Sequence, residues 1–280
     1  MTIEEVISQA LLEDIGEGDH TSLSTIPDSA IGKAKLLVKE EGVLAGVEIA
    51  LRIFRQIDPG IVVDVRITDG TPVKPGDIVF FVEGKSSTLL TAERTVLNFM
   101  QRMSGIATQT RKIVEAIGDL PTRVLDTRKT TPLLREFEKM AVRIGGGLNH
   151  RFGLFDMVLI KDNHVDFAGG IENAIKAAHD YLNMKKLDLK IEIETRNIEE
   201  VKRVLNCGGV DRIMLDNFSF EDLAQAVHLI NGRFETEASG GITLNTVRRY
   251  AECGVDFVSI GSITHHISSL DLSLKAVTLD

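Results

Sequence analysis

The sequence predicts an α/β protein in which a helix-covered parallel sheet follows a smaller α+β domain. Short apolar segments alternate with helical segments from Arg123 onward, which is typical of a parallel sheet. Earlier in the chain, helices and strands occur in a mixed order, with turn signals at Asp69-Gly70 and Pro75-Gly76-Asp77. Polar or glycine residues directly follow each apolar segment of the second part. These strand ends favour a barrel over an open sheet, because the carboxyl ends of barrel strands share one face.

The first part of the chain combines a long helix with several short elements. Apolar periodicity predicts helices over Ile3–Leu12, Val47–Ile57 and Thr91–Ile117, the last with a bend allowed near Ser104-Gly105. Strands are expected over Ala34–Lys39, Ile61–Ile67 and Ile78–Val82. We place an N-terminal domain at residues 1–115 and a catalytic domain at residues 116–280, with the last residues free to return to the first domain.

The second part contains six predicted strands with five predicted helices between them. The strands are expected over Arg123–Leu125, Met157–Ile160, Leu189–Ile193, Arg212–Leu215, Glu235–Ala238 and Phe257–Ile260. The helices are expected over Leu133–Ile144, Ile171–Tyr181, Ile198–Asn206, Phe220–Ile230 and Leu244–Cys253.

Composition excludes several classes of protein. The 280 residues carry a net charge of −9, whereas a protein that binds duplex nucleic acid needs a basic face. No apolar run approaches the ~20 residues that span a bilayer, and the acidic start is not a secretory signal. Only Cys207 and Cys253 are present, which fits a reduced cytoplasmic protein. We expect a cytoplasmic protein that binds neither nucleic acid nor a membrane.

The residues at the strand ends suggest a site for anions. Ser239, Gly240 and Gly241 follow the fifth strand, and Ile260, Gly261 and Ser262 close the sixth. Loops after the last strands of a barrel commonly bind phosphate through backbone amides. Cationic side chains gather in the first third of the barrel, at Arg128, Lys129, His150, Arg151 and Lys161. The loop Gly145-Gly146-Gly147 between them is expected to pass close to a ligand or a partner chain.

Two carboxylates, Glu194 and Asp216, follow neighbouring strands of the predicted sheet. Such a pair can bind a divalent cation or accept hydrogen bonds from ribose hydroxyls. A structural ion-pair network with Lys161 and Lys129 is the competing interpretation. Together these groups suggest a substrate with a terminal phosphate, other negative groups, and a sugar or metal between them.

Long motifs resemble those of the quinolinate phosphoribosyltransferases, and the likeness covers the chain in the family's order. In the barrel they are Asp126-Thr127-Arg128-Lys129-Thr130-Thr131-Pro132, Gly145-Gly146-Gly147 to His150-Arg151, Ile160-Lys161-Asp162-Asn163-His164, Leu215-Asp216-Asn217-Phe218, Glu237-Ala238-Ser239-Gly240-Gly241-Ile242 and Thr264-His265. In the first part they are Glu13-Asp14-Ile15 to Gly18-Asp19-His20-Thr21 and Ala92-Glu93-Arg94-Thr95 to Asn98.

The resemblance implies an N-terminal α+β sandwich domain followed by an irregular (β/α) barrel. It implies a homodimer in which the N-terminal domain of one subunit closes the other's site. The reaction would join quinolinate to phosphoribosyl pyrophosphate with Mg2+, releasing pyrophosphate and carbon dioxide and giving nicotinate mononucleotide for NAD biosynthesis.

The resemblance also implies residue roles. Catalytic roles fall to Lys129, Lys161, Glu194 and Asp216, the last two also facing Mg2+ and the ribose. Arg94 would reach the neighbouring subunit's site. The expected substrate-binding set is completed by Thr127, Arg128, His150, Arg151, Ser239, Gly240, Gly241, Ile260, Gly261, Ser262 and His265. The sequence departs from the family pattern at Thr195-Arg196 and at His266, where serine is usual.

Three alternatives stay open at this point. A sister phosphoribosyltransferase would act on another anionic base. A Schiff-base lyase on the same barrel would use Lys161 or Lys129 as its nucleophile. A non-catalytic anion-binding protein would need no carboxylates for metal or ribose.

Overall fold

The computed structural model describes residues 1–277, and the chain forms two compact units. The first unit combines Met1–Arg111, Thr130–Gly146 and the segment from Thr264 onward. The second combines Lys112–Lys129 and Gly147–Ile263. Within residues 1–277, no helix is both long and apolar enough to cross a membrane.

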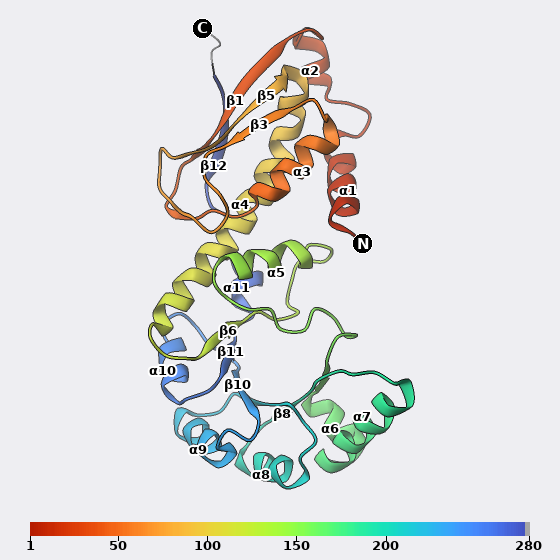
Figure 1. Cartoon of the computed structure of the whole chain (residues 1–280), viewed down its shortest axis with the longest axis vertical. Helices are drawn as coiled ribbons and strands as arrows, with labels where there is room; N and C mark the ends of the chain where they lie inside the picture. The colour runs from red at the N-terminus through yellow and green to blue at the C-terminus, as the bar shows by residue number, and fades with distance from the viewer. Residues whose placement is uncertain (278–280) are drawn as a thin grey trace. The chain divides into compact units, whose positions relative to one another are not determined.

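A four-stranded antiparallel sheet forms the centre of the first unit (Figure 1). Its order is β12 (Leu272–Val277), β1 (Ile31–Val38), β5 (Ile78–Lys85) and β3 (Val62–Val65). The last described strand therefore pairs with the first strand of the chain. A separate short pair joins β2 (Gly42–Val43) to β4 (Pro72–Val73).

Helices complete the first unit. They are α1 (Ile3–Ile15), α2 (His20–Thr25), α3 (Val47–Ile57), α5 (Arg135–Ile144) and the first part of α4 (Ser86–Ile117). Helix α1 begins at a capping box, in which the Thr2 side chain accepts from the Glu5 amide and the Glu5 side chain accepts from the Thr2 amide. Phe54 of α3 meets Phe80 of β5 edge to face, with ring centroids 6.0 Å apart, and both side chains are buried.

The second unit contains a parallel six-stranded sheet. Strands β7 to β11 lie side by side in chain order, and β6 lies next to β11. The order is β6 (Arg123–Leu125), β11 (Phe257–Ser259), β10 (Glu235–Ser239), β9 (Arg212–Asp216), β8 (Ile191–Thr195) and β7 (Val158–Ile160). The connecting helices are α6 (Asp162–Ala168), α7 (Ile171–Lys185), α8 (Ile198–Cys207), α9 (Phe220–Ile230) and α10 (Val247–Glu252), and α11 (Ser262–His265) follows β11. Figure 1 shows α8 and α9 following one another along the outside of the curved sheet.

The barrel is irregular because its two outermost strands are not joined by a ladder. Beyond β6 a single parallel bridge connects Leu125 to Leu148, and within residues 1–277 no ladder joins β6 to β7. The expected α/β fold with an N-terminal antiparallel sheet domain is confirmed.

Most predicted elements are confirmed, and the differences lie at their ends. The third barrel strand was expected at Leu189–Ile193 but spans Ile191–Thr195, so Glu194 lies inside it rather than after it. The Asp211 carboxylate accepts the Ile191 amide at 2.7 Å and so helps to fix where this strand begins. The long helix starts at Ser86 and continues to Ile117 as one helix across Ser104-Gly105, where the sequence allowed a bend.

Candidate active site

Consecutive parallel strands carry the polar groups of the candidate site at their carboxyl ends. Lys161 follows β7, Glu194 lies near the end of β8, Asp216 ends β9 and Ser239 ends β10. The register places Ser239 opposite Asp216, and Glu194 opposite Met214, two residues before Asp216. Because side chains alternate along a strand, Glu194 and Asp216 point to the same side of the sheet from neighbouring strands.

Glu194 and Asp216 form a carboxylate pair next to a lysine. The Lys161 Nζ atom lies 3.6 Å from Glu194 Oε2. Burial raises the pKa of Glu194, Lys161 opposes this increase, and the negative charge of Asp216 adds to it. The site thus holds more negative charge than Lys161 neutralises. Oxygen ligands with excess negative charge suit Mg2+, so this donor set fits the expected metal.

A glycine turn follows the carboxylate pair. Gly240 has a φ of +97°, and a Cβ atom there would lie 2.2 Å from Asn217 Oδ1 and 2.6 Å from Asn217 Cγ. The Asn217 amide donates to the Ser239 carbonyl at 2.9 Å, and its side chain donates to Asp216 Oδ2 at 2.7 Å. Only glycine fits at position 240, because the turn both needs positive φ and packs against Asn217. The backbone can therefore approach a ligand closely here.

The cationic residues lie on two loops. Thr127, Arg128 and Lys129 follow β6, where the Lys129 amide donates to Thr127 Oγ1 at 3.1 Å. Arg151 lies before β7, and its Nη1 atom donates to the Met157 carbonyl at 3.2 Å. Burial and then the charge of Arg128 lower the pKa of Arg151. Two guanidinium groups that repel each other, one exposed and one half-buried, would suit an anion.

Asp126 connects these two loops, and the sequence assigned it no role of its own. Its buried carboxylate accepts from Asn149 Nδ2 at 2.6 Å and from the His150 amide at 2.8 Å. The sequence did show an acidic residue between an apolar strand and the Thr127-Arg128-Lys129 loop. Its position at a strand end does not reveal which residues its carboxylate contacts.

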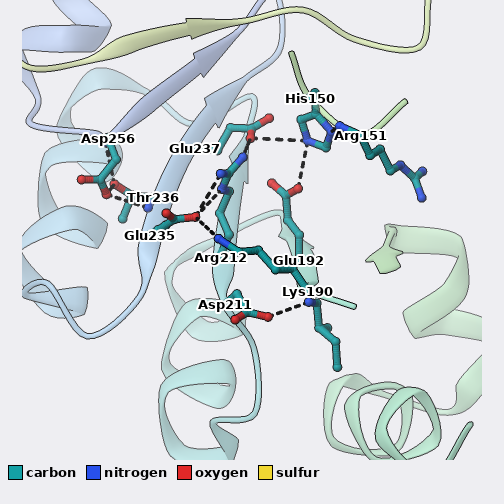
Figure 2. Close-up of polar contacts among 11 residues, drawn as sticks. His150, Arg151, Lys190, Glu192, Asp211, Arg212, Glu235, Thr236, Glu237 and Asp256 are labelled. Atoms are coloured by element: carbon teal, nitrogen blue, oxygen red, sulfur yellow. Dashed lines mark hydrogen bonds and ion pairs between the residues drawn. The ribbon is translucent and has the colours of Figure 1, made fainter. Parts of the chain in front are cut away.

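His150 points into the unit and meets charged side chains there (Figure 2). Its Nε2 atom lies 2.9 Å from Glu192 Oε2 and 3.5 Å from Glu237 Oε2. Arg212 Nη1 donates to the same Glu237 oxygen at 2.8 Å. Glu192 and Arg212 were not singled out from the sequence, where both read as ordinary strand residues, and Glu237 was quoted there only as part of a family motif with no role of its own.

Two opposing effects set the protonation of His150. Burial lowers its pKa, whereas the contacts and negative charges of Glu192 and Glu237 raise it. The Arg151 amide donates to His150 Nδ1 at 2.7 Å, which opposes a proton on that nitrogen. This short contact favours a ring with one proton, on Nε2, facing the carboxylates.

The remaining expected residues have these positions. Arg94 is exposed on α4, and His265 is exposed at the end of α11, both in the first unit. Ile260 is buried and its amide donates to the Leu125 carbonyl at 3.0 Å, so this amide is already used within the sheet. Gly241 and Gly261 lie in the loops after β10 and β11, and Ser262 is the first residue of α11. The roles of these residues in binding stay predictions.

The sequence matches the quinolinate phosphoribosyl transferase N-terminal domain over residues 19–104 and the C-terminal domain over residues 106–275. The chain belongs to the quinolinate phosphoribosyltransferase family. The chloroplastic nicotinate-nucleotide pyrophosphorylase (carboxylating) of Arabidopsis thaliana is 48% identical over 291 residues, covering 99% of this chain and 83% of the relative. A probable nicotinate-nucleotide pyrophosphorylase (carboxylating) of Synechocystis is 43% identical, covering 98% of this chain and 92% of the relative.

Solved structures agree with this assignment to the quinolinate phosphoribosyltransferase family. NadC from Streptococcus pyogenes superposes with a TM-score of 0.94 at 41% identity, covering 99% of this chain and 97% of that chain. The nicotinate-nucleotide pyrophosphorylase of Francisella tularensis gives a TM-score of 0.92 at 39% identity, covering 98% and 96%.

Local contacts explain the departure from the family pattern at Thr195-Arg196 but not the one at His266. Thr195 is buried and donates from Oγ1 to the Met214 carbonyl at 2.9 Å. The Arg196 guanidinium pairs with Glu200 at 2.7 Å and Asp166 at 3.2 Å, so it joins α8 to α6. Nothing in the structure explains His266, whose ring stands edge to face with His265.

The glycine loop after α5 was expected near a ligand or partner, and for its first residue the structure gives a different reason. A Cβ atom on Gly145 would lie 2.6 Å from the Ala107 carbonyl oxygen and 2.7 Å from Thr110 Cβ. Gly145 is therefore needed so that the end of α5 can approach helix α4 closely.

Proposed function

We propose that this chain transfers the phosphoribosyl group of phosphoribosyl pyrophosphate to quinolinate and releases pyrophosphate and carbon dioxide, giving nicotinate mononucleotide for NAD biosynthesis. Membership of the quinolinate phosphoribosyltransferase family supports this activity. Two groups of charged side chains carry the proposal. Arg128 and Arg151 repel each other, and Glu194 and Asp216 form a carboxylate pair at the carboxyl ends of β8 and β9.

The cations suit a substrate with two adjacent carboxylates. Arg128 and Arg151 repel each other in the absence of an anion, and a dicarboxylate would relieve this repulsion. Arginine can bind a carboxylate with two parallel hydrogen bonds, which also fixes the orientation of the ring. Lys129 and Lys161 would complete the pocket, and Lys161 remains tied to Glu194 at 3.6 Å.

The sugar phosphate would bind at the neighbouring strand ends. The amides around Ser239, Gly240 and Gly261 would hold the 5-phosphate, and Glu194 and Asp216 would accept hydrogen bonds from the ribose hydroxyls. Mg2+ held by the same carboxylates, directly or through the substrate, would stabilise negative charge on the departing pyrophosphate.

The chemistry then requires positioning more than a covalent nucleophile. The quinolinate ring nitrogen bonds to the anomeric carbon as the bond to pyrophosphate breaks, and the cations fix the nitrogen at the correct face. In the second step the bond from the ring to its 2-carboxylate breaks and carbon dioxide leaves. The electron pair left on carbon is stabilised by the adjacent positively charged ring nitrogen until a proton replaces the carboxylate.

The assembly is proposed to be a homodimer in which Arg94 serves the site of the partner subunit. Its exposed position on α4 leaves the guanidinium available for such a contact. The cytoplasmic location expected from the sequence stays a prediction, since plant relatives are named as chloroplastic or mitochondrial proteins.

Substrate competition tests the proposal. Release of pyrophosphate and carbon dioxide is measured with quinolinate or nicotinate at fixed phosphoribosyl pyrophosphate and Mg2+. Nicotinate lacks the second carboxylate and would lose a charge-assisted contact to the half-buried Arg151 guanidinium, which costs on the order of 2 kcal/mol. We expect kcat/KM for quinolinate to exceed that for nicotinate by more than about tenfold. In the Arg151→Ala variant this ratio should be smaller. Comparable values for the two acids would favour the sister phosphoribosyltransferase.

A further inference from the structure

A layer of buried charge lies directly below the candidate site. Glu192 precedes Glu194 by two residues in β8, and Glu237 precedes Ser239 by two residues in β10. Side chains two residues apart in a strand point to the same side of the sheet. The strands that present the site at their ends therefore also place two carboxylates one step deeper, and both side chains are 0% exposed.

Arg212 of β9 holds this layer from one side. It lies opposite Glu192 in the sheet register. Its guanidinium donates to Glu237 Oε2 at 2.8 Å and to Glu235 Oε2 at 2.9 Å, and it stacks on the Phe257 ring at 4.1 Å. Glu237 is thus fixed between Arg212 and His150.

His150 connects the buried layer to the expected substrate pocket. Its Nε2 atom lies 2.9 Å from Glu192 and 3.5 Å from Glu237, while its Nδ1 atom accepts the Arg151 amide at 2.7 Å. Figure 2 shows the ring turned toward the two carboxylates and the Arg151 side chain extending in another direction. Both ring nitrogens therefore have partners in the protein, on opposite sides of the ring.

Stability alone does not account for buried charge at this place. The inner layers of parallel barrels are ordinarily filled by branched apolar side chains. Replacing buried ion pairs by apolar residues of similar volume is often neutral or stabilising. A function for the layer explains why charged residues stand where apolar ones would pack.

We infer that Glu192 and Glu237 are positioning residues that act through His150 to fix the backbone of Arg151, and so aim its guanidinium at a carboxylate of the substrate. The carboxylates orient the ring by its Nε2 proton, and Nδ1 then holds the Arg151 amide. This inference rests on the proposed function, because it requires that Arg151 binds the dicarboxylate.

A cation site is the other use that this geometry suggests. His150, Glu192 and Glu237 offer ligand atoms within 4.8 Å of one another, all of them buried. Arg212 already places a positive charge 2.8 Å from Glu237 Oε2, within the same cluster. Because the guanidinium already balances part of the negative charge of this layer, the positioning role is favoured.

The test compares matched variants of the full-length enzyme. Glu192→Met removes the acceptor but keeps most of the volume, whereas Glu192→Gln keeps an oxygen that can accept from Nε2. Glu235→Gln is the control, because Glu235 lies on the same strand as Glu237 and contacts Arg212 at 2.9 Å without a contact to His150 in this network. Melting temperature is measured for each variant.

We expect Glu192→Met to raise the KM for quinolinate about tenfold while the KM for phosphoribosyl pyrophosphate stays within about twofold. Glu192→Gln should recover most of the loss, and Glu235→Gln should leave both values unchanged. In the Arg151→Ala background, Glu192→Met should cause little further loss of quinolinate binding, because the two residues act through one contact.

Several outcomes would overturn the inference. They are equal changes in both KM values, no recovery with Gln, or losses that multiply in the double variant. If Glu192→Met does not fold, the ring 15N shifts of His150 are measured in the wild-type enzyme and in Glu192→Gln. Both should show the ring protonated on Nε2, and an Nδ1-protonated ring in either enzyme would contradict the positioning role. If wild-type enzyme fails to turn over quinolinate, the proposed function fails instead.

Discussion

The glycine turn after β10 gives the sharpest prediction about the sugar-phosphate end of the site. In the Gly240→Ala variant, the new Cβ atom would lie 2.2 Å from Asn217 Oδ1 and 3.0 Å from the Asn217 backbone nitrogen. Asn217 must therefore move, and its 2.7 Å hydrogen bond to Asp216 Oδ2 is lost. Asp216 would then lose the contact that orients its carboxylate.

The neighbouring glycine provides a matched control. Gly241 has a φ of +62°, and a Cβ atom there would have no neighbour within 4 Å, so Gly241→Ala adds left-handed strain without a clash. Left-handed strain costs about 1–2 kcal/mol and is offset by about 0.4–1 kcal/mol from the stiffer unfolded chain. We expect Gly241→Ala to lower the free energy of unfolding by about 1 kcal/mol. Gly240→Ala should lower it by about 2–3 kcal/mol, because it adds the clash and one lost hydrogen bond.

The decisive assay is steady-state kinetics with phosphoribosyl pyrophosphate as the varied substrate. Gly240→Ala should raise its KM more than about tenfold, a difference of about 1.4 kcal/mol in binding. Gly241→Ala should change it much less, and the quinolinate KM should stay near its wild-type value in both variants. Equal effects of the two substitutions on this KM would refute the claim that the Gly240–Asn217 contact holds Asp216.

Three further outcomes are expected. In Asp162→Asn, removal of a negative charge that raises the pKa of Glu194 should let Glu194 stay ionised at lower pH, so the acid limb of the pH profile of kcat/KM should shift to lower pH; no shift would mean that another group sets this limb. Inactive Arg94→Ala and inactive Lys129→Ala subunits should recover part of the activity when mixed, because each mixed dimer would contain one complete shared site; no recovery despite proven subunit exchange would argue against a shared site. Thr195→Val should lower the free energy of unfolding by about 1 kcal/mol, measured by chemical denaturation, because it removes the 2.9 Å hydrogen bond to the Met214 carbonyl.

The sequence made most of the barrel predictable because its signals are local. Strand β6 and helix α9 were predicted with the bounds that the structure has, since apolar runs and periodic faces are encoded by neighbouring residues. The polar strand ends were equally visible, and they led to Lys161, Glu194 and Asp216. The start of β8 was misplaced by two residues, because the Asp211 carboxylate that receives the Ile191 amide lies 20 positions away in the chain.

By itself, the sequence determined the α/β fold, the order of its elements and an anion site made of cations, carboxylates and glycines. Only the tertiary structure showed that Asp126 ties the Asn149-His150 segment to β6 and that Gly145 packs against α4. Only the tertiary structure brought Glu192 and Glu237 to His150. The physical reason is that residue type and periodicity fix which way a side chain points, whereas the partner that it meets is set by the register of strands far apart in the chain.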